Sequence, residues 1–195
     1  VRIIFARRLV AEKGTRLAIE VFKELLLRHR NIQITIAGEG EDKSLFTQNF
    51  SQDSRVTVTS YDVESATKFH RDFDIAFVPS VCGEATSFSI LEAMSAGCAV
   101  VATNMFGIIT EIIPMHNGVL CFPEKDSLVA GVEYLIENPA RRVEIQRNAW
   151  KTCQEGFSIE AWRSRWKAIF KEMINGKETA QDKMKKRTKR FYYFL

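Results

Sequence analysis

Two glutamates, Glu84 and Glu92, lie eight positions apart where an apolar run gives way to a loop of small residues and then to a helical pattern. The backbone amides of Ser87, Phe88 and Ser89 are expected to be free at the start of that helix. Free amides and the positive end of the helix dipole suit a phosphate group. Glu92 can then accept hydrogen bonds from a ribose, and Glu84 can reach a sugar beyond the phosphates. The stretch is therefore compatible with a ligand that carries a phosphate, a ribose and a sugar.

The same residues also have a purely structural interpretation. Ser89-x-x-Glu92 fits a capping box, in which the glutamate reaches back to a backbone N–H at the helix start. Glu84 taken alone is typical of a solvated loop charge. The local pattern leaves both interpretations open.

The elements that must position these residues alternate between strand and helix patterns. Short runs rich in Val and Ile predict strands at 1–6, 32–37, 56–59, 74–79, 98–102 and 118–122. Helical patterns open at Gly14 and cover 41–50, 63–70, 87–96, 108–113, 127–137, 139–155 and 159–174. This alternation predicts an α/β fold, a doubly wound parallel sheet of the Rossmann-like kind. Ligands of such sheets bind beyond the carboxyl ends of the strands, and the Glu84 loop follows one of them.

Residues 79–97 resemble the E-x7-E motif of glycosyltransferases with the GT-B fold, in particular the retaining family 4, or glycosyl transferases group 1. The segment LEAMSAGCAVVAT at 91–103 is similar to that family over its whole length, and the resemblance covers about residues 3–170. It implies that residues 1–176 form the C-terminal, nucleotide-sugar-binding half of a GT-B fold. The N-terminal acceptor domain of such an enzyme is expected to lie outside this chain.

The segment RLVAEKG, from Arg8 to Gly14, resembles the family's G-R-L-x-x-x-K-G loop after the first strand of this domain. The resemblance implies that Arg8 and Lys13 neutralise the donor diphosphate and stabilise charge on the leaving group. A guanidinium offers a fork for phosphate oxygens and an ammonium a point charge. In isolation both are ordinary solvated charges. Arg7 stands where the family usually has glycine.

The resemblance assigns Arg8, Lys13 and Glu84 to catalysis and a second set to donor binding: Glu92, Gly38, Glu39, Ser87, Phe88, Ser89, Ile90 and Tyr61. Gly38-Glu39-Gly40 resembles the family's G-x-G turn near the nucleotide, although a surface turn explains it equally well. Tyr61 sits where relatives hold the base, and a partly buried structural tyrosine is the alternative. Two further departures are Ser87 and Phe106, each at a position where the family usually has glycine.

Charge and composition exclude several other functions. The net charge of +4 comes from the segment 177–195, which carries seven Lys or Arg against two acidic residues and leaves −1 for the rest, so a nucleic-acid surface is not indicated. The basic and aromatic tail has three open roles: a solvated end, a contact with the acceptor domain, or peripheral contact with anionic lipid. The four cysteines form no CxxC pair and favour the cytoplasm, with membrane association at the inner face open. No metal or other cofactor is expected.

These observations predict a donor domain that binds a nucleotide diphosphate sugar for retaining transfer of a hexose to a saccharide or lipid-linked acceptor. By itself the chain is expected to bind donor without turnover. Two alternatives stay open: a non-catalytic nucleotide-binding domain of the same fold, and a sugar-nucleotide epimerase. A flavodoxin-like signalling module is excluded, because it needs acidic residues where this chain has Arg7 and Arg8.

Overall fold

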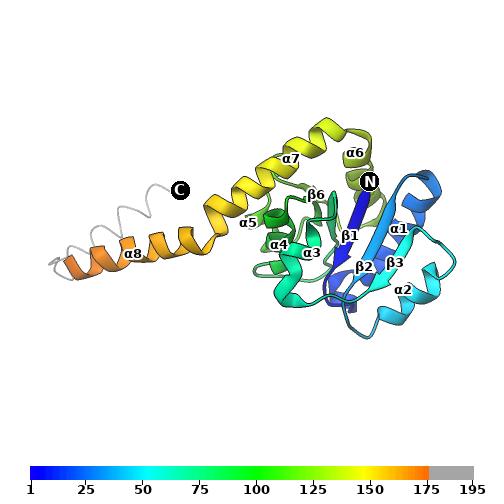
Figure 1. The fold of residues 1–195 in the computed structure, drawn as a ribbon, viewed down its shortest axis with the longest axis horizontal. Coiled ribbons are helices and arrows are strands. Elements are labelled where there is room, and N and C mark those ends of the chain that lie inside the picture. The colour runs from blue at the N-terminus through cyan, green and yellow to red at the C-terminus, as the bar shows by residue number, and fades with distance from the viewer. Residues whose placement is uncertain (176–195) are drawn as a thin grey trace. The chain divides into compact units, whose positions relative to one another are not determined.

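The computed structural model describes residues 1–175 and contains a single six-stranded parallel sheet (Figure 1). The strands are β1 (Arg2–Ala6), β2 (Gln33–Ala37), β3 (Val56–Thr59), β4 (Ile75–Val78), β5 (Ala99–Thr103) and β6 (Val119–Cys121). Their order is β3-β2-β1-β4-β5-β6, and every neighbouring pair is parallel. The predicted doubly wound α/β fold is confirmed, and each predicted strand is present.

Helices lie between the strands and after the last of them. They are α1 (Thr15–Arg28), α2 (Lys43–Phe50), α3 (Ala66–His70), α4 (Phe88–Ala96), α5 (Ile108–Glu111), α6 (Lys125–Glu137), α7 (Pro139–Thr152) and α8 (Ile159–Asn175). Short 3-10 turns occupy Ala11–Lys13 and Val63–Ser65, and a π-helical turn covers Cys153–Phe157. These helices match the predicted ranges to within a few residues at each end.

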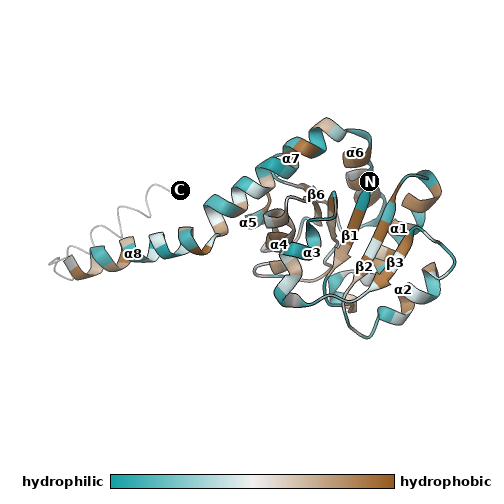
Figure 2. Cartoon of the chain, in the orientation of Figure 1, coloured by the Kyte–Doolittle hydropathy of each residue, from teal (hydrophilic) through white to brown (hydrophobic). Residues whose placement is uncertain are grey.

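The middle of the sheet is buried on both faces, so every residue of β4 and β5 is buried. In β1, Ile3 and Phe5 join the core beneath α1, α2 and α6, whereas Ile4 and Ala6 point to the opposite core beneath α4 and α5. This alternation follows from the two-residue period of a strand. Figure 2 shows the result as hydrophobic strands flanked by helices with mixed surfaces.

The strand order changes direction between β1 and β4. From β1 the chain proceeds toward β2 and β3, and from β4 it proceeds toward β5 and β6. A crevice forms at such a switch point, because the connections leave on opposite sides of the sheet. The loop that begins at Arg7, after β1, and the loop that begins at Pro79, after β4, therefore lie at the same edge of the sheet.

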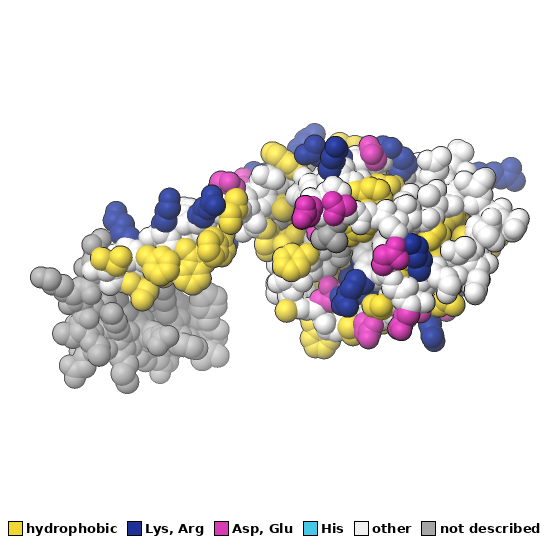
Figure 3. Space-filling model, turned by 60° about the horizontal axis from the view of Figure 1, so that its bottom comes forward, with side chains coloured by type: hydrophobic (Ala, Val, Ile, Leu, Met, Phe, Trp, Pro, Cys, Tyr) yellow, Lys and Arg dark blue, Asp and Glu magenta, His cyan; other side chains and the backbone are white. Residues whose placement is uncertain are grey.

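The chain divides into two compact units, with the boundary after Glu155. Helix α8 belongs to the second unit. One side of α8 is apolar and includes the neighbouring rings of Trp162, Trp166 and Phe170, with centroids 6.0 and 5.5 Å apart along the helix. Figure 3 shows basic side chains along the other side of this helix.

Two sequence interpretations can be compared with this fold. Among the described residues, no helix is both long enough and apolar enough to cross a bilayer. The basic tail at 177–195 lies outside the described residues. Cys98, Cys121 and Cys153 are buried free thiols, and burial raises the pKa of each. Cys82 is partly exposed.

Candidate functional site

The loop after β1 is held by the glycine-rich turn after β2. Leu9 donates its N–H to the carbonyl of Glu39 over 2.8 Å, and Asp42 donates to the carbonyl of Leu9 over 2.9 Å. Gly38 has a φ of 147°, and a Cβ there would lie 1.9 Å from the carbonyl oxygen of Arg7. Only glycine permits this approach. Gly38-Glu39-Gly40 thus supports the Arg8 loop directly, and the Glu39 side chain is exposed and bonded to Lys43 and Ser60.

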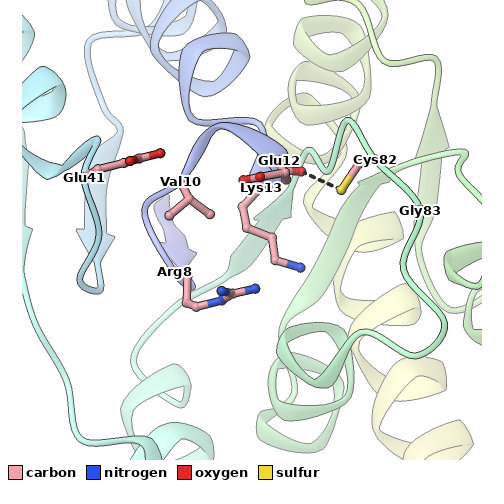
Figure 4. Close-up of a pocket in the computed structure, with 7 residues that line it drawn as sticks. All are labelled: Arg8, Val10, Glu12, Lys13, Glu41, Cys82 and Gly83. Carbon is pink, nitrogen blue, oxygen red and sulfur yellow. Dashed lines mark hydrogen bonds between the residues drawn. The ribbon is translucent and has the colours of Figure 1, made fainter.

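Arg8 and Lys13 line one pocket at this edge of the sheet (Figure 4). It has a volume of about 430 Å³, within the range of small-molecule sites. Its other lining residues are Val10, Glu12, Glu41, Cys82 and Gly83. Figure 4 shows the cationic groups of Arg8 and Lys13 on the same side of the loop, with the Glu41 carboxylate apart from both. The structure therefore brings together the two residues assigned to a diphosphate.

Glu84 is buried beside this pocket, and three donors converge on its Oε1 atom. Arg7 Nη2 lies at 2.6 Å and Lys13 Nζ at 3.0 Å, and the hydroxyl of Ser80 also donates to it. Burial acts to raise the pKa of Glu84, but the charge of Arg7 and the hydrogen bonds from Ser80 and Lys13 outweigh it and lower the pKa to about 2. Glu84 is therefore a fixed anion and not a solvated loop charge.

The start of α4 differs from the sequence prediction. The Ser87 amide is not free, because it donates to Glu111 Oε1 over 2.7 Å. The helix begins at Phe88, and no side chain caps it, so the capping box of Ser89 and Glu92 does not form. Among residues 1–175, no acceptor is found for the amides of Phe88 and Ser89. Two of the three predicted amides thus remain available to an anion.

Ile90 and Glu92 both lie on α4, but they differ in how deeply they are buried. Ile90 is fully buried in the core and its amide donates to the carbonyl of Ser87 over 3.0 Å, so neither its side chain nor its N–H is available to a ligand. Its assignment to donor binding therefore has no support in the position of this residue and stays a prediction. Glu92 is half-buried, and burial raises the pKa of its carboxyl. It does not line the pocket of Arg8 and Lys13.

Tyr61 follows β3 and is packed against Phe69, with the two rings parallel at 3° and their centroids 5.2 Å apart. Burial raises the pKa of its phenol, to which the charge of Glu92 also contributes. One face of the ring is therefore occupied by the protein, as the structural alternative predicted. Tyr61 and Glu92 still lie near each other on the α4 side of the crevice.

Sequence reasoning misses three features of this site. Ser80 accepts a hydrogen bond from Arg7 and donates one to Glu84. In the sequence, only its position just after β4 indicates that it belongs to the site. Arg7 stands out in the sequence as a departure from glycine, and the sequence leaves open whether it crowds the loop or adds a third cation. Glu111 carries no local signal, because it reaches Ser87 from α5, 24 residues further along the chain. Burial and the nearby charge of Glu84 raise the pKa of Glu111 to about 7, against the hydrogen bond from Ser87.

Several similar proteins of known sequence are named as glycosyltransferases. An uncharacterized glycosyltransferase of Methanocaldococcus jannaschii is 29% identical over 187 residues, which are 93% of this chain and 46% of that protein. The chain spans less than half the length of the curated relatives that it matches.

Solved structures share the fold. The C-terminal domain of a glycosyl transferase group 1 family protein (LpcC) from Francisella tularensis is 25% identical, with a TM-score of 0.71, over 81% of this chain and 86% of that one. Anabaena HepE in complex with UDP-glucose has a TM-score of 0.76 at 19% identity, over 88% of this chain and 48% of that one.

The sheet order, the convergence of Arg8, Lys13 and Glu84 at its switch point, and these similarities agree with one another. Residues 1–152 match the family of glycosyl transferases group 1. The chain therefore belongs to the glycosyl transferases group 1 family, with the Rossmann-like fold of GT-B glycosyltransferases.

Proposed function

We propose that this chain is the donor domain of a retaining hexosyltransferase, which moves a sugar from a nucleoside diphosphate to a saccharide or lipid-linked acceptor. One observation carries the proposal: Arg8 and Lys13 share a pocket of about 430 Å³ at the switch point, directly beside the ionised Glu84. In a crevice that Glu12 and Glu41 also line, Arg8 and Lys13 offer two cations to a diphosphate, and Glu84 offers an anion to the hydroxyl groups of a sugar.

The chemistry follows from these charges. Cleavage of a sugar–phosphate bond leaves a nucleoside diphosphate with additional negative charge, and fixed cations at that position lower the barrier. Arg8 and Lys13 take this role. The Oε2 atom of Glu84 makes no hydrogen bond within the described residues, so it can accept one from a sugar hydroxyl. Glu92, nearer to Tyr61, receives the ribose.

The acceptor site belongs to a part of the enzyme other than the described sheet. The M. jannaschii relative is about twice the length of this chain, and the family resemblance implies a second domain that binds the acceptor. We therefore expect the 195-residue chain to bind a donor but not to turn it over. Robust sugar transfer catalysed by these residues alone, measured with radiolabelled donor, would contradict this.

We further propose that donor binding needs no metal, because Arg8 and Lys13 supply the positive charge. Calorimetric titration with a nucleoside diphosphate in the presence of EDTA, and again with magnesium, tests this directly. Equal affinities are the expected result. Binding that requires magnesium would contradict the metal-free proposal while leaving the donor site in place.

The main experiment is calorimetric titration with UDP, GDP and ADP, repeated for Arg8→Ala and Lys13→Ala. Each substitution should weaken the best diphosphate by about tenfold or more, since a charge-assisted hydrogen bond contributes about 1.5–3 kcal/mol. Arg147→Ala and Lys23→Ala are matched controls, because both side chains are exposed and lie in helices away from the pocket. Equal effects of site and control variants, or no binding by the folded protein, would overturn the proposal.

One observation favours a second candidate, a domain of this fold that binds nucleotide without chemistry. The Ser87 amide is already occupied by Glu111, which leaves fewer donors for a diphosphate. A donor site gains affinity from the sugar through Glu84, whereas a simple nucleotide site does not. The second candidate would be favoured if UDP-glucose and UDP bind with equal affinity, and if Glu84→Gln leaves the affinity for UDP-glucose unchanged.

A further inference from the structure

Arg7 departs from the family pattern and lies inside the site. Only 6% of the residue is exposed, and its guanidinium bridges two side chains of the loop after β4. Nη1 donates to Ser80 Oγ over 2.9 Å, and Nη2 donates to Glu84 Oε1 over 2.6 Å. Arg7 therefore connects the end of β1 to the end of β4 across the switch point.

The bonds around Glu84 are unevenly divided between its two oxygens. Arg7, Lys13 and Ser80 all donate to Oε1, and none of them donates to Oε2. Oε2 has no hydrogen-bond partner among the described residues, and it is not a fully buried atom. It therefore keeps some access to solvent. The cluster thus fixes the carboxylate by one oxygen and presents the other.

The charges of the cluster do not cancel. Glu84 is opposed by two cations, Arg7 and Lys13, at 2.6 and 3.0 Å. If Arg7 were absent, Lys13 alone would pair with Glu84, and the two opposite charges would cancel. With Arg7 present, the three residues together keep one net positive charge, and Lys13 lines the pocket where this charge can act.

We propose that Arg7 is a positioning residue that holds Glu84 by Oε1, presents Oε2 to the donor sugar, and leaves the charge of Lys13 for the diphosphate. This inference rests on the proposed function for its ligand, a nucleoside diphosphate sugar. The coupling of Arg7 to Glu84 is a property of the free protein and can be tested without any ligand.

The first test is the titration of Glu84, followed through the carbon-13 shift of its carboxyl group between pH 7 and pH 3. Wild type should stay ionised over this range, because Arg7, Lys13 and Ser80 all favour the anion. In Arg7→Ala only Lys13 and Ser80 remain to favour the anion, and burial, which favours the protonated carboxyl, opposes them. The midpoint should rise by about one pH unit or more. An unchanged titration in Arg7→Ala would overturn the inference.

The second test compares the affinities of UDP and UDP-glucose, so that the sugar contribution is measured as a ratio. Arg7→Ala should reduce the advantage of UDP-glucose over UDP by about tenfold, as expected for a lost hydrogen bond to a charged group. Arg147→Ala, the exposed control, should leave the ratio unchanged. An unchanged ratio in Arg7→Ala would show that Arg7 has no influence on the sugar.

Arg7→Lys guards against a variant that does not fold. It keeps the positive charge but loses the fork, so Glu84 should stay ionised while the affinity ratio falls between those of wild type and Arg7→Ala. Full rescue of the ratio would overturn the role of the fork in positioning. If the wild type binds neither UDP nor UDP-glucose, the proposed function fails, and the Glu84 titration still decides the coupling to Arg7.

Discussion

The loop after β4 and the end of α5 each bring one buried carboxylate to the same corner of the sheet, in opposite surroundings. Glu84 receives three donors on one oxygen, two of them cations. Glu111 receives one backbone amide, and its Oε2 is buried without a partner among residues 1–175. The pKa is lowered to about 2 for the first and raised to about 7 for the second. Equal burial therefore does not imply equal charge, because the partners decide which form is stable.

The largest expected effect comes from removing the charge of Glu84. Glu84→Gln leaves Arg7 buried without its counter-ion, and breaking a buried pair in this way costs about 3–5 kcal/mol of unfolding free energy. Urea denaturation at pH 7 measures it. Glu39→Gln is the matched control, because its pair with Lys43 is exposed and should contribute less than about 1 kcal/mol. Equal losses in the two variants would mean that the Arg7–Glu84 pair is not buried in solution.

The second-largest effect is expected from a substitution at Gly107, where the loop after β4 contacts the start of α5. Gly107 donates its N–H to the carbonyl of Glu84 over 2.8 Å, and a Cβ at this position would lie 1.9 Å from the carbonyl oxygen of Ala85. Gly107→Ala should therefore force the loop and α5 apart, at a cost of about 3 kcal/mol measured by thermal unfolding.

Gly97→Ala provides the control for that substitution. Gly97 has a φ of 88°, but in the described part of the chain no atom lies within 4 Å of an added Cβ, so Gly97→Ala should lose only about 1 kcal/mol from backbone strain. A Gly107→Ala protein as stable as Gly97→Ala would indicate that the junction adapts without strain.

The smallest effect is a difference in how the two carboxylates make the unfolding free energy depend on pH. Glu111 has a folded pKa above its unfolded value of about 4.3, so its contribution to stability is complete below that value and is lost as the pH rises through about 7. Glu84 behaves oppositely: its contribution is present above about pH 4.3 and is lost as the pH falls toward 2.

Glu111→Gln isolates the first of these contributions. Relative to wild type, the variant should gain about 2 kcal/mol of unfolding free energy between pH 5 and pH 8, because each pKa unit corresponds to about 1.4 kcal/mol. Taking the difference between the two proteins removes the contribution of other groups such as His70, whose pKa burial lowers. A difference that does not change with pH would show that Glu111 is ionised in the folded protein across this range.

The succession of strands and the position of the site can be predicted from the sequence, because both depend on local patterns. Apolar runs identify buried strands, and ligands of a parallel sheet bind beyond the carboxyl ends of such strands. The loops that carry Arg8, Lys13 and Glu84 both follow predicted strands, so the sequence alone places all three residues at one edge of the sheet. The family resemblance supplies their roles.

Contacts between distant side chains cannot be predicted in this way. The bond from Ser87 to Glu111 joins residues on separate loops, and its geometry depends on how α5 packs. The role of Arg7 escapes prediction for a similar reason: an arginine after a strand can turn outward to solvent or inward to a carboxylate, and its neighbours along the chain do not distinguish the two. The motif assigns Ile90 by its position alone, without regard to the helix face that it occupies.

The distribution of aromatic residues has a practical consequence for spectroscopy. All three tryptophans, Trp150, Trp162 and Trp166, lie on α7 and α8 and are about half exposed. The pocket of Arg8 and Lys13 has no tryptophan in its lining. Intrinsic fluorescence of this protein is therefore a reporter of its last two helices, whose indole emission should shift to the blue when their exposed faces are covered.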